Sequence, residues 1–157
     1  MAGFIPFLGV YSASKFALEA LAESYRYDLA SFGVDSVLIE PGAYPTPVWG
    51  KLAQPDVWGP VAQPADRSRV AEYGEIAEIP TQMGASVLEM FAGPEAPNPQ
   101  EVVDVVAKLI ETPAGERPLR TVVGQGGPEF ALRVNDAAEQ AQADLMAMLG
   151  LTHLMKL

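Results

Sequence analysis

The sequence contains no cysteine and a single histidine, His153. Without cysteine, the chain cannot form disulfides, thiolate nucleophiles or cysteine-bound metal sites. One histidine cannot supply a metal site of several imidazoles, and it can serve a Ser-His-Asp triad only if it folds back from the C-terminal tail. We therefore expect no metal centre and no cysteine-dependent chemistry.

Basic residues are scarce as well, since 10 Lys and Arg stand against 20 Asp and Glu, for a formal net charge of -10. An acidic surface repels phosphates, which argues against nucleic acid and anionic membranes as partners. No apolar run reaches the roughly 18 residues of a membrane span. The apolar start also lacks the basic region that precedes a secretory signal. These absences predict a cytoplasmic protein without a membrane span.

One strong helical pattern is present, from Tyr11 to Ser31. Apolar residues recur there at spacings near 3.6, alanines fill much of the rest, and Gly33 is a natural C-terminal stop. The apolar segment Val34–Glu40 then ends at Pro41-Gly42, which predicts a buried strand followed by a turn. Both faces of this strand are apolar, as in a parallel sheet that is covered on both sides.

The rest of the chain mixes irregular and helical segments. Five prolines make residues 43–65 irregular, with a short helix around 48–52, whereas 66–92 is helical in pattern with a break or kink at Pro80. The last three elements are expected at 99–111 (helix), 119–124 (strand) and 128–150 (helix). Two strands do not form an independently stable sheet, so this pattern predicts that further strands come from elsewhere.

Tyr11 and Lys15 stand four residues apart at the start of the first helix, so they project from the same face. A free phenol has a pKa of about 10 and is a poor acid or base at neutral pH, but a nearby ammonium favours the phenolate. Such a pair can move a proton to or from a carbonyl or alcohol oxygen while a hydride moves at the adjacent carbon. Alone, the spacing is weak evidence, because a helical tyrosine usually packs.

The stretch from Tyr11 to Thr46 closely resembles the short-chain dehydrogenase/reductase family, in its branch of retinol- and hydroxysteroid-dehydrogenase-like sequences. The resemblance includes Tyr11, Ser14-Lys15, the alanine-rich helix, the strand, and Pro41-Gly42 with Thr46 shortly after it, and it continues more loosely through 98–124. It implies an α/β fold, namely the C-terminal half of a Rossmann-like doubly wound parallel sheet. We expect this half to be helix-rich with about two strands, and the N-terminal cofactor-binding half to be missing.

The resemblance also implies an NAD(P)-dependent oxidoreductase that acts on an alcohol or a ketone. Tyr11 would be the general acid/base, and Lys15 would hold the nicotinamide ribose hydroxyls. Pro41, Gly42 and the backbone of Tyr44 would line the nicotinamide, and Thr46 would bind its carboxamide or phosphate side. The residues that choose NAD or NADP are not recognisable, so the preference stays open.

Three segments of one partial domain, 1–157, follow from the same resemblance. Residues 1–46 would hold the catalytic helix and the Pro-Gly turn, 47–97 a substrate-lobe-like segment, and 98–157 the last helix–strand–helix. Large apolar residues in the lobe-like segment suggest a lipid-like alcohol or ketone, such as a steroid or retinoid, although a helical lid is the competing interpretation. The candidate substrate contacts are Phe7, Leu8 and Trp49.

Two family features are absent. The glycines of 124–130 lack the spacing of a phosphate-binding fingerprint, and no serine occurs in 1–10, just before the tyrosine. We therefore expect a C-terminal fragment that binds NAD(P) weakly alone. The alternative is a catalytically inactive fragment or an interaction module that keeps only the scaffold. In either case, the alanine-rich helix 11–31 would allow a homo-oligomer through close helix contact.

Overall fold

The computed structural model describes residues 6–48, 68–124 and 128–155. The chain forms two compact units, unit 1 with Met1–Gly42 and Gln100–Leu157, and unit 2 with Ala43–Pro99. These boundaries fall close to the ends of the lobe-like segment 47–97. The division of one domain into three segments stays a prediction, and most of the short helix predicted at 48–52 lies outside the described residues.

Helix α1 spans Gly9–Asp28 and is followed by one turn of 3-10 helix at Ala30–Phe32. The predicted helix is thereby confirmed, with a start two residues before Tyr11. Gly33 ends the segment in the left-handed region at φ 69°, and its N–H donates to the Ala30 carbonyl at 3.0 Å. Glycine adopts this conformation without the clash of a Cβ, which confirms the predicted stop.

Replacing Gly33 tests this stop. A Cβ at this position would meet no atom within 4 Å, so backbone strain alone sets the cost. We expect Gly33→Ala to lower the free energy of unfolding by about 1–2 kcal/mol. Gly33→Asn should cost less, because asparagine tolerates the left-handed region. Urea denaturation of both variants measures the difference, and an alanine variant as stable as the parent would contradict the argument.

Strands β1 (Leu38–Pro41) and β2 (Arg120–Val123) pair in parallel. Leu38 lies opposite Arg120, and the register continues to Pro41 opposite Val123. In the part of the chain that the structure describes, these two strands form the sheet. The prediction of about two strands in a helix-rich α/β fold is confirmed, and the arrangement is that of part of a Rossmann-like fold.

The predicted strand Val34–Glu40 began too early, because the ladder starts only where the Leu38 N–H donates to the Leu119 carbonyl at 2.8 Å. The two polar residues before it use their side chains instead. Ser36 Oγ donates to the Ala22 carbonyl of α1 at 2.8 Å. The Asp35 carboxylate, 1% exposed, lies 3.7 Å from both Arg26 and Arg117. Side-chain anchoring of this segment to α1 and to Arg117 thus replaces strand pairing.

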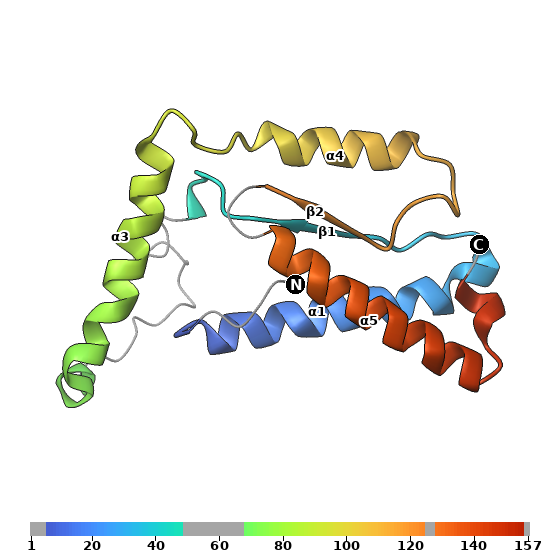
Figure 1. The fold of residues 1–157 in the computed structure, drawn as a ribbon, viewed down its shortest axis with the longest axis horizontal. Helices are drawn as coiled ribbons and strands as arrows, with labels where there is room; N and C mark the ends of the chain where they lie inside the picture. Colours follow the sequence, from blue (N-terminus) through green and yellow to red (C-terminus); the bar gives the residue numbers. More distant parts are fainter. Residues whose placement is uncertain (1–5, 49–67, 125–127, 156–157) are drawn as a thin grey trace, which may run out of the picture. The chain divides into compact units, whose positions relative to one another are not determined.

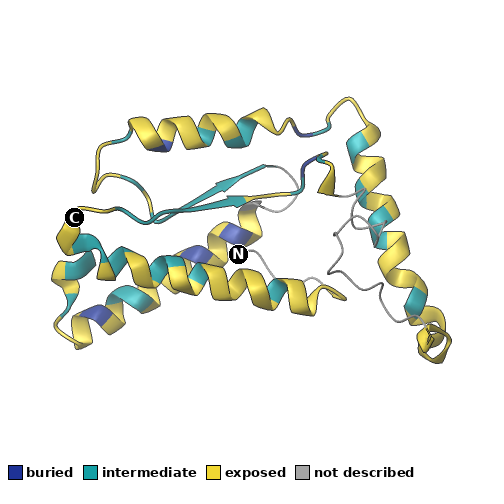
Figure 2. Cartoon of the chain, turned by 180° about the vertical axis from the view of Figure 1, so that it is seen from behind, coloured by how far each residue is buried: buried dark blue, intermediate teal, exposed yellow. Residues whose placement is uncertain are grey.

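Helices cover both faces of the sheet in unit 1. Helix α4 (Gln100–Glu111) lies on one face, and α1 and α5 (Pro128–Met148) lie together on the other (Figure 1). The predicted helices 99–111 and 128–150 are therefore confirmed to within two residues at either end. Burial is concentrated on α4 and α5 rather than on α1, which has no buried residue (Figure 2). The buried residues of unit 1 are Leu109, Ala131, Asn135 and Met146.

Unit 2 consists, in its described part, of a 3-10 segment at Val70–Glu78 and helix α3 at Ile79–Ala92. Pro80 does not kink the middle of a helix. It stands in the first turn of α3, where its missing N–H costs nothing. The non-helical backbone lies earlier, at Gly74 with φ 56° and ψ -136°. The interruption predicted within 66–92 is present, but it lies at Gly74 rather than at Pro80.

Candidate active site

Tyr11 and Lys15 lie in the first two turns of α1. The Lys15 Nζ stands 5.5 Å from the centroid of the Tyr11 ring, a distance at which an ammonium is attracted to the face of the ring. The Tyr11 side chain is 58% exposed, so a ligand can reach it. The structure therefore brings the two predicted catalytic side chains together in an accessible position.

The N-terminal end of α1 is electropositive. Its first turn contains no acidic residue, and Leu8 precedes it without a side-chain cap. The unpaired N–H groups of a helix start carry partial positive charge, which Lys15 increases. The start of a helix with these properties favours an oxygen-rich or negatively charged ligand group.

Pro41 and Gly42 end β1 and form the second part of the site. Both are exposed, and the Gly42 N–H donates to the Val123 carbonyl at 2.8 Å. In unit 1 the N-terminal end of α1 and the carboxyl ends of both strands lie at the same end (Figure 1). Ligands of open α/β sheets bind at the carboxyl ends of the strands. The structure thus places the Tyr11–Lys15 pair and the Pro-Gly turn at the end where such a ligand sits.

The other predicted cofactor residues belong to unit 2. Tyr44 is 6% exposed, Thr46 is half-buried, and the Thr46 N–H donates to the Tyr44 carbonyl at 2.8 Å. This bond closes a tight three-residue turn. It engages the backbone carbonyl of Tyr44, which the resemblance placed beside the nicotinamide. The roles of Tyr44 and Thr46 stay predictions.

Phe7 and Leu8, the candidate substrate contacts, are 50% and 40% exposed. Phe7 has φ 66°, a conformation that a bulky side chain rarely adopts and that clusters at functional sites when it does occur. Trp49 lies outside the described residues.

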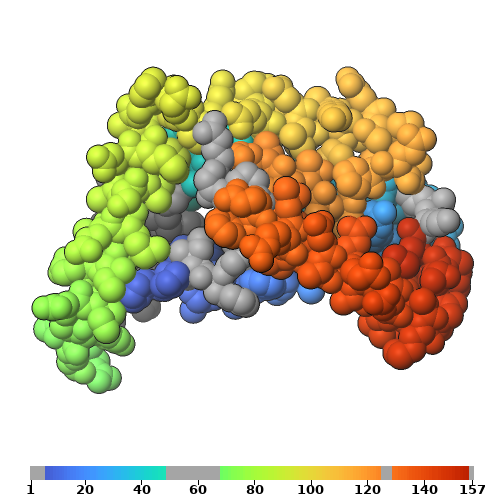
Figure 3. All heavy atoms as spheres, in the orientation of Figure 1, coloured from blue at the N-terminus to red at the C-terminus, as the bar shows by residue number. Residues whose placement is uncertain are grey.

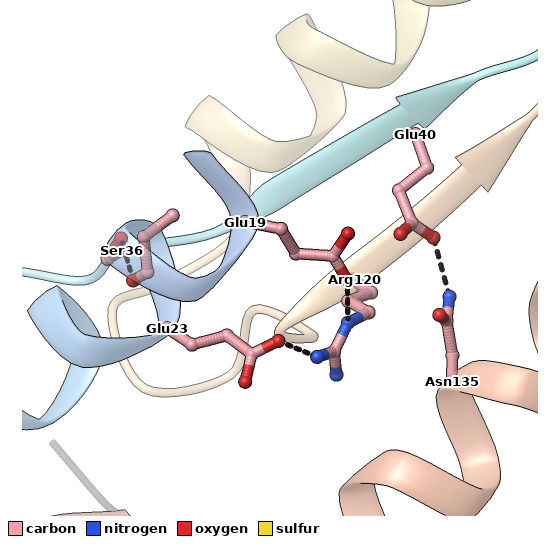
Figure 4. A network of polar contacts seen from close by, with 7 residues as sticks. Glu19, Glu23, Ser36, Glu40, Arg120 and Asn135 are labelled. Carbon is pink, nitrogen blue, oxygen red and sulfur yellow. Dashed lines mark hydrogen bonds and ion pairs between the residues drawn. The ribbon is translucent and has the colours of Figure 1, made fainter. Parts of the chain in front are cut away.

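Polar contacts that the sequence did not reveal orient α1 on the sheet (Figure 4). The Arg120 guanidinium, 7% exposed, reaches from β2 between Glu19 and Glu23 of α1. Its Nε lies 3.2 Å from Glu19 Oε1, and its Nη2 donates to Glu23 Oε1. Glu19 and Glu23 continue the four-residue spacing of Tyr11 and Lys15. The spacing could have shown that all four share one side of the helix, but not that Arg120 lies opposite two of them.

A groove of about 380 Å³ runs between α1 and α5. Apolar and polar side chains both line it, and Arg120, Glu19, Glu23 and Asn135 are among them. Figure 3 shows the side chains of α5 as a continuous ridge in front of the sheet. The groove contains the polar network rather than the Tyr11–Lys15 pair, so it is separate from the candidate active site.

Comparison with known proteins agrees with this geometry. The family model for short chain dehydrogenases matches residues 1–56, the segment that holds the tyrosine–lysine pair, the Pro-Gly turn and every other predicted site residue. Over these residues the chain is similar to the short-chain dehydrogenase/reductase family. Relatives that resemble the chain include the uncharacterized oxidoreductase YusZ of Bacillus subtilis, 34% identical over 126 residues.

Two further relatives match over shorter stretches. Retinol dehydrogenase 5 of Mus musculus is 52% identical over 40 residues, and 17-beta-hydroxysteroid dehydrogenase type 1 of Mus musculus is 54% identical over 48 residues. The match to YusZ covers 80% of this chain but only 40% of YusZ. The match to the retinol dehydrogenase covers 26% of this chain and 13% of that protein, and the match to the hydroxysteroid dehydrogenase covers 31% and 14%. The chain therefore aligns with less than half the length of each relative.

Neither a metal cluster nor a membrane helix is found in the residues that the structure describes. Across 6–48, 68–124 and 128–155, no three acidic or histidine side chains gather to hold a metal ion. No helix in the same ranges is long and apolar enough to cross a membrane.

Proposed function

We propose that the protein is an NAD(P)-dependent oxidoreductase that interconverts an alcohol and a ketone at the Tyr11–Lys15 pair. The observation that carries the proposal is the accessible pair itself, at 5.5 Å between ammonium and ring centroid, at the strand ends of a short-chain dehydrogenase/reductase.

The residues present suit a nicotinamide cofactor. Lys15 offers three N–H donors for ribose hydroxyls, and the positive end of α1 suits oxygen-rich groups. Gly42 has no side chain, so a flat ring can approach its backbone. NAD or NADP, when bound, supplies or accepts the hydride. The contribution of Thr46 and of the Tyr44 backbone to the same cofactor is part of the proposal.

Tyr11 then acts on the proton. In reduction, its hydroxyl donates a hydrogen bond and then its proton to the carbonyl oxygen of the substrate. In oxidation, the phenolate oxygen accepts the alcohol proton. Proton transfer by a positioned side chain of this kind is general acid–base catalysis.

We further propose an apolar substrate. Unit 2 exposes large apolar side chains, an arrangement that marks surfaces for apolar ligands. These side chains are Tyr73, Ile76, Leu88 and Met90. The names of the retinol and hydroxysteroid dehydrogenases that resemble the chain point to the same chemical class. A cytoplasmic location and a homo-oligomer through α1 complete the proposal.

The test is carbonyl-dependent oxidation of NADH and NADPH. The assay uses the 157-residue chain and, beside it, the product of the longest reading frame that contains these residues. Steroid ketones and retinaldehyde are the substrates, with a sugar ketone as the polar control. We expect turnover with the apolar ketones and little with the sugar. Absence of ketone-dependent turnover in both proteins, with both cofactors, would refute the proposed function.

A further inference from the structure

One buried amide on α5 contacts the residue that precedes the Pro-Gly turn. The Nδ2 of Asn135 donates to Glu40 Oε2 at 2.5 Å (Figure 4). Asn135 is 6% exposed and therefore buried. One helical turn earlier, Ala131 is 2% exposed, so Asn135 lies on the face that α5 turns inward. A buried amide is costly unless it is hydrogen-bonded, and a carboxylate is a strong acceptor.

The Glu40 side chain connects this contact to the site. Glu40 lies opposite Val122 in the sheet, and it is followed directly by Pro41-Gly42. Within the turn itself, the Gly42 N–H donates to the Val123 carbonyl at 2.8 Å. The residue before the turn is therefore held by α5 through a side chain, and the turn is held by β2 through the backbone.

The charges on the same side of the sheet do not duplicate this contact. Arg120 shares the groove between α1 and α5 with Asn135, but its guanidinium donates to Glu19 and Glu23. That network attaches α1 to β2. The Asn135–Glu40 bond attaches α5 to the end of β1, at the residue beside the turn.

We propose that Asn135 is a positioning residue, which holds Glu40 and thereby fixes the Pro41-Gly42 turn at the candidate active site. The inference rests on the proposed function, because that function is what gives the turn its role in holding the cofactor. It adds that α5 contributes to the site without touching the cofactor, because the geometry of the turn depends on a bond from α5.

The test exchanges the two partners. Asn135→Asp places a carboxylate against Glu40, so the bond is lost and the two charges repel. Glu40→Gln keeps an acceptor for the Asn135 amide and serves as the matched control. The double variant Glu40→Gln/Asn135→Asp restores a donor and a charged acceptor in the reverse order. Met146→Ala, at another buried position of α5, controls for general loss of helix packing.

Amide hydrogen exchange, measured by NMR in the 157-residue chain, is the first readout. The Gly42 amide reports on the turn, and the Leu38 amide, which donates to Leu119 at the other end of β1, reports on the sheet as a whole. We expect Asn135→Asp to raise the Gly42 exchange rate relative to Leu38 about tenfold or more, the effect of losing a buried charged hydrogen bond. The double variant should return the ratio to within about threefold of the parent.

Several results would overturn the proposal. One is an equal rise at Gly42 and Leu38 in Asn135→Asp, which is the pattern expected of Met146→Ala. Another is a double variant that exchanges like Asn135→Asp. If Asn135→Asp alone fails to fold, circular dichroism replaces exchange as the readout. Refolding on addition of Glu40→Gln supports the pairing, and continued unfolding refutes it.

Kinetics of the active form separate this inference from the proposed function. Asn135→Asp should raise KM for NAD(P)H and lower kcat, whereas the double variant should recover both. If the parent turns over no ketone while the Gly42 exchange responds as expected, the proposed function fails and the anchoring of the turn stands. If the parent is active and Asn135→Asp changes neither KM nor the exchange ratio, the positioning role is wrong.

Discussion

Replacing Tyr11 by phenylalanine is expected to lower kcat for ketone reduction by about 10²–10⁴-fold, the usual contribution of a positioned general acid. The ring stays, and so does its contact with Lys15 at 5.5 Å, so only the proton donor is removed. Because the side chain is 58% exposed, the loss of its hydroxyl should leave the free energy of unfolding almost unchanged. Steady-state kinetics and urea denaturation of the same preparation measure both quantities.

Tyr25 provides the matched control. It lies on the same helix and is 46% exposed, but it stands at the opposite end of α1 from the Pro-Gly turn. Tyr25→Phe should leave kcat unchanged. Equal losses of activity in the two variants would mean that the assay reports helix integrity rather than proton transfer, and an active Tyr11→Phe variant would remove Tyr11 from the mechanism.

Replacing Arg120 by methionine is expected to lower the free energy of unfolding by about 2–4 kcal/mol, near the lower end for breaking a buried ion pair. The substitution keeps most of the side-chain volume but removes the cation that lies between Glu19 and Glu23. Their side chains are only 15% and 25% exposed, so water compensates them incompletely. The change represents a large share of the stability of a small domain, and urea denaturation measures it directly.

Two controls test whether buried charge causes this loss of stability. When Glu19→Gln and Glu23→Gln are added to Arg120→Met, most of the lost stability should return, because the two side chains that faced Arg120 are then neutral. Arg69 pairs with Glu72 on the surface of unit 2, with side chains 74% and 59% exposed, and its hydrogen bonds lower the pKa of the Glu72 carboxyl. Arg69→Met should barely move the urea midpoint, since solvent screens exposed pairs. A comparable loss in Arg69→Met would contradict the role of burial.

Local sequence signals predicted most helices and the second strand well. Apolar periodicity, helix-favouring alanines and the stop at Gly33 are properties of neighbouring residues, and each element formed within a few positions of its expected bounds. The early start assigned to β1 shows where such signals fail. Val34–Glu40 is apolar enough for a strand, but pairing depends on where β2 begins, and Asp35 and Ser36 bind side-chain and backbone partners far along the chain.

In the site, too, contacts within one element could be predicted from the sequence, whereas contacts between distant elements could not. Tyr11 and Lys15 are four residues apart, so helical geometry alone brings them together. Arg120 lies 97 residues from Glu23, and Asn135 lies 95 residues from Glu40. No periodicity within a single element could have paired them. The family resemblance did not supply them either, because it carried over only the residues of the motif.

The Arg120 network also restricts how the length of α1 can change. Each residue of an α-helix turns the chain by about 100° and raises it by about 1.5 Å. A single insertion between Lys15 and Glu19 would leave the carboxylates bound to Arg120 while it rotated the tyrosine and lysine toward a different side of the helix. An insertion of seven residues would keep the facing but move the pair about 10.5 Å along the axis. The rotation of the Tyr11–Lys15 pair about the helix axis and its position along that axis are therefore both fixed. This helix consequently tolerates substitution far better than any insertion or deletion.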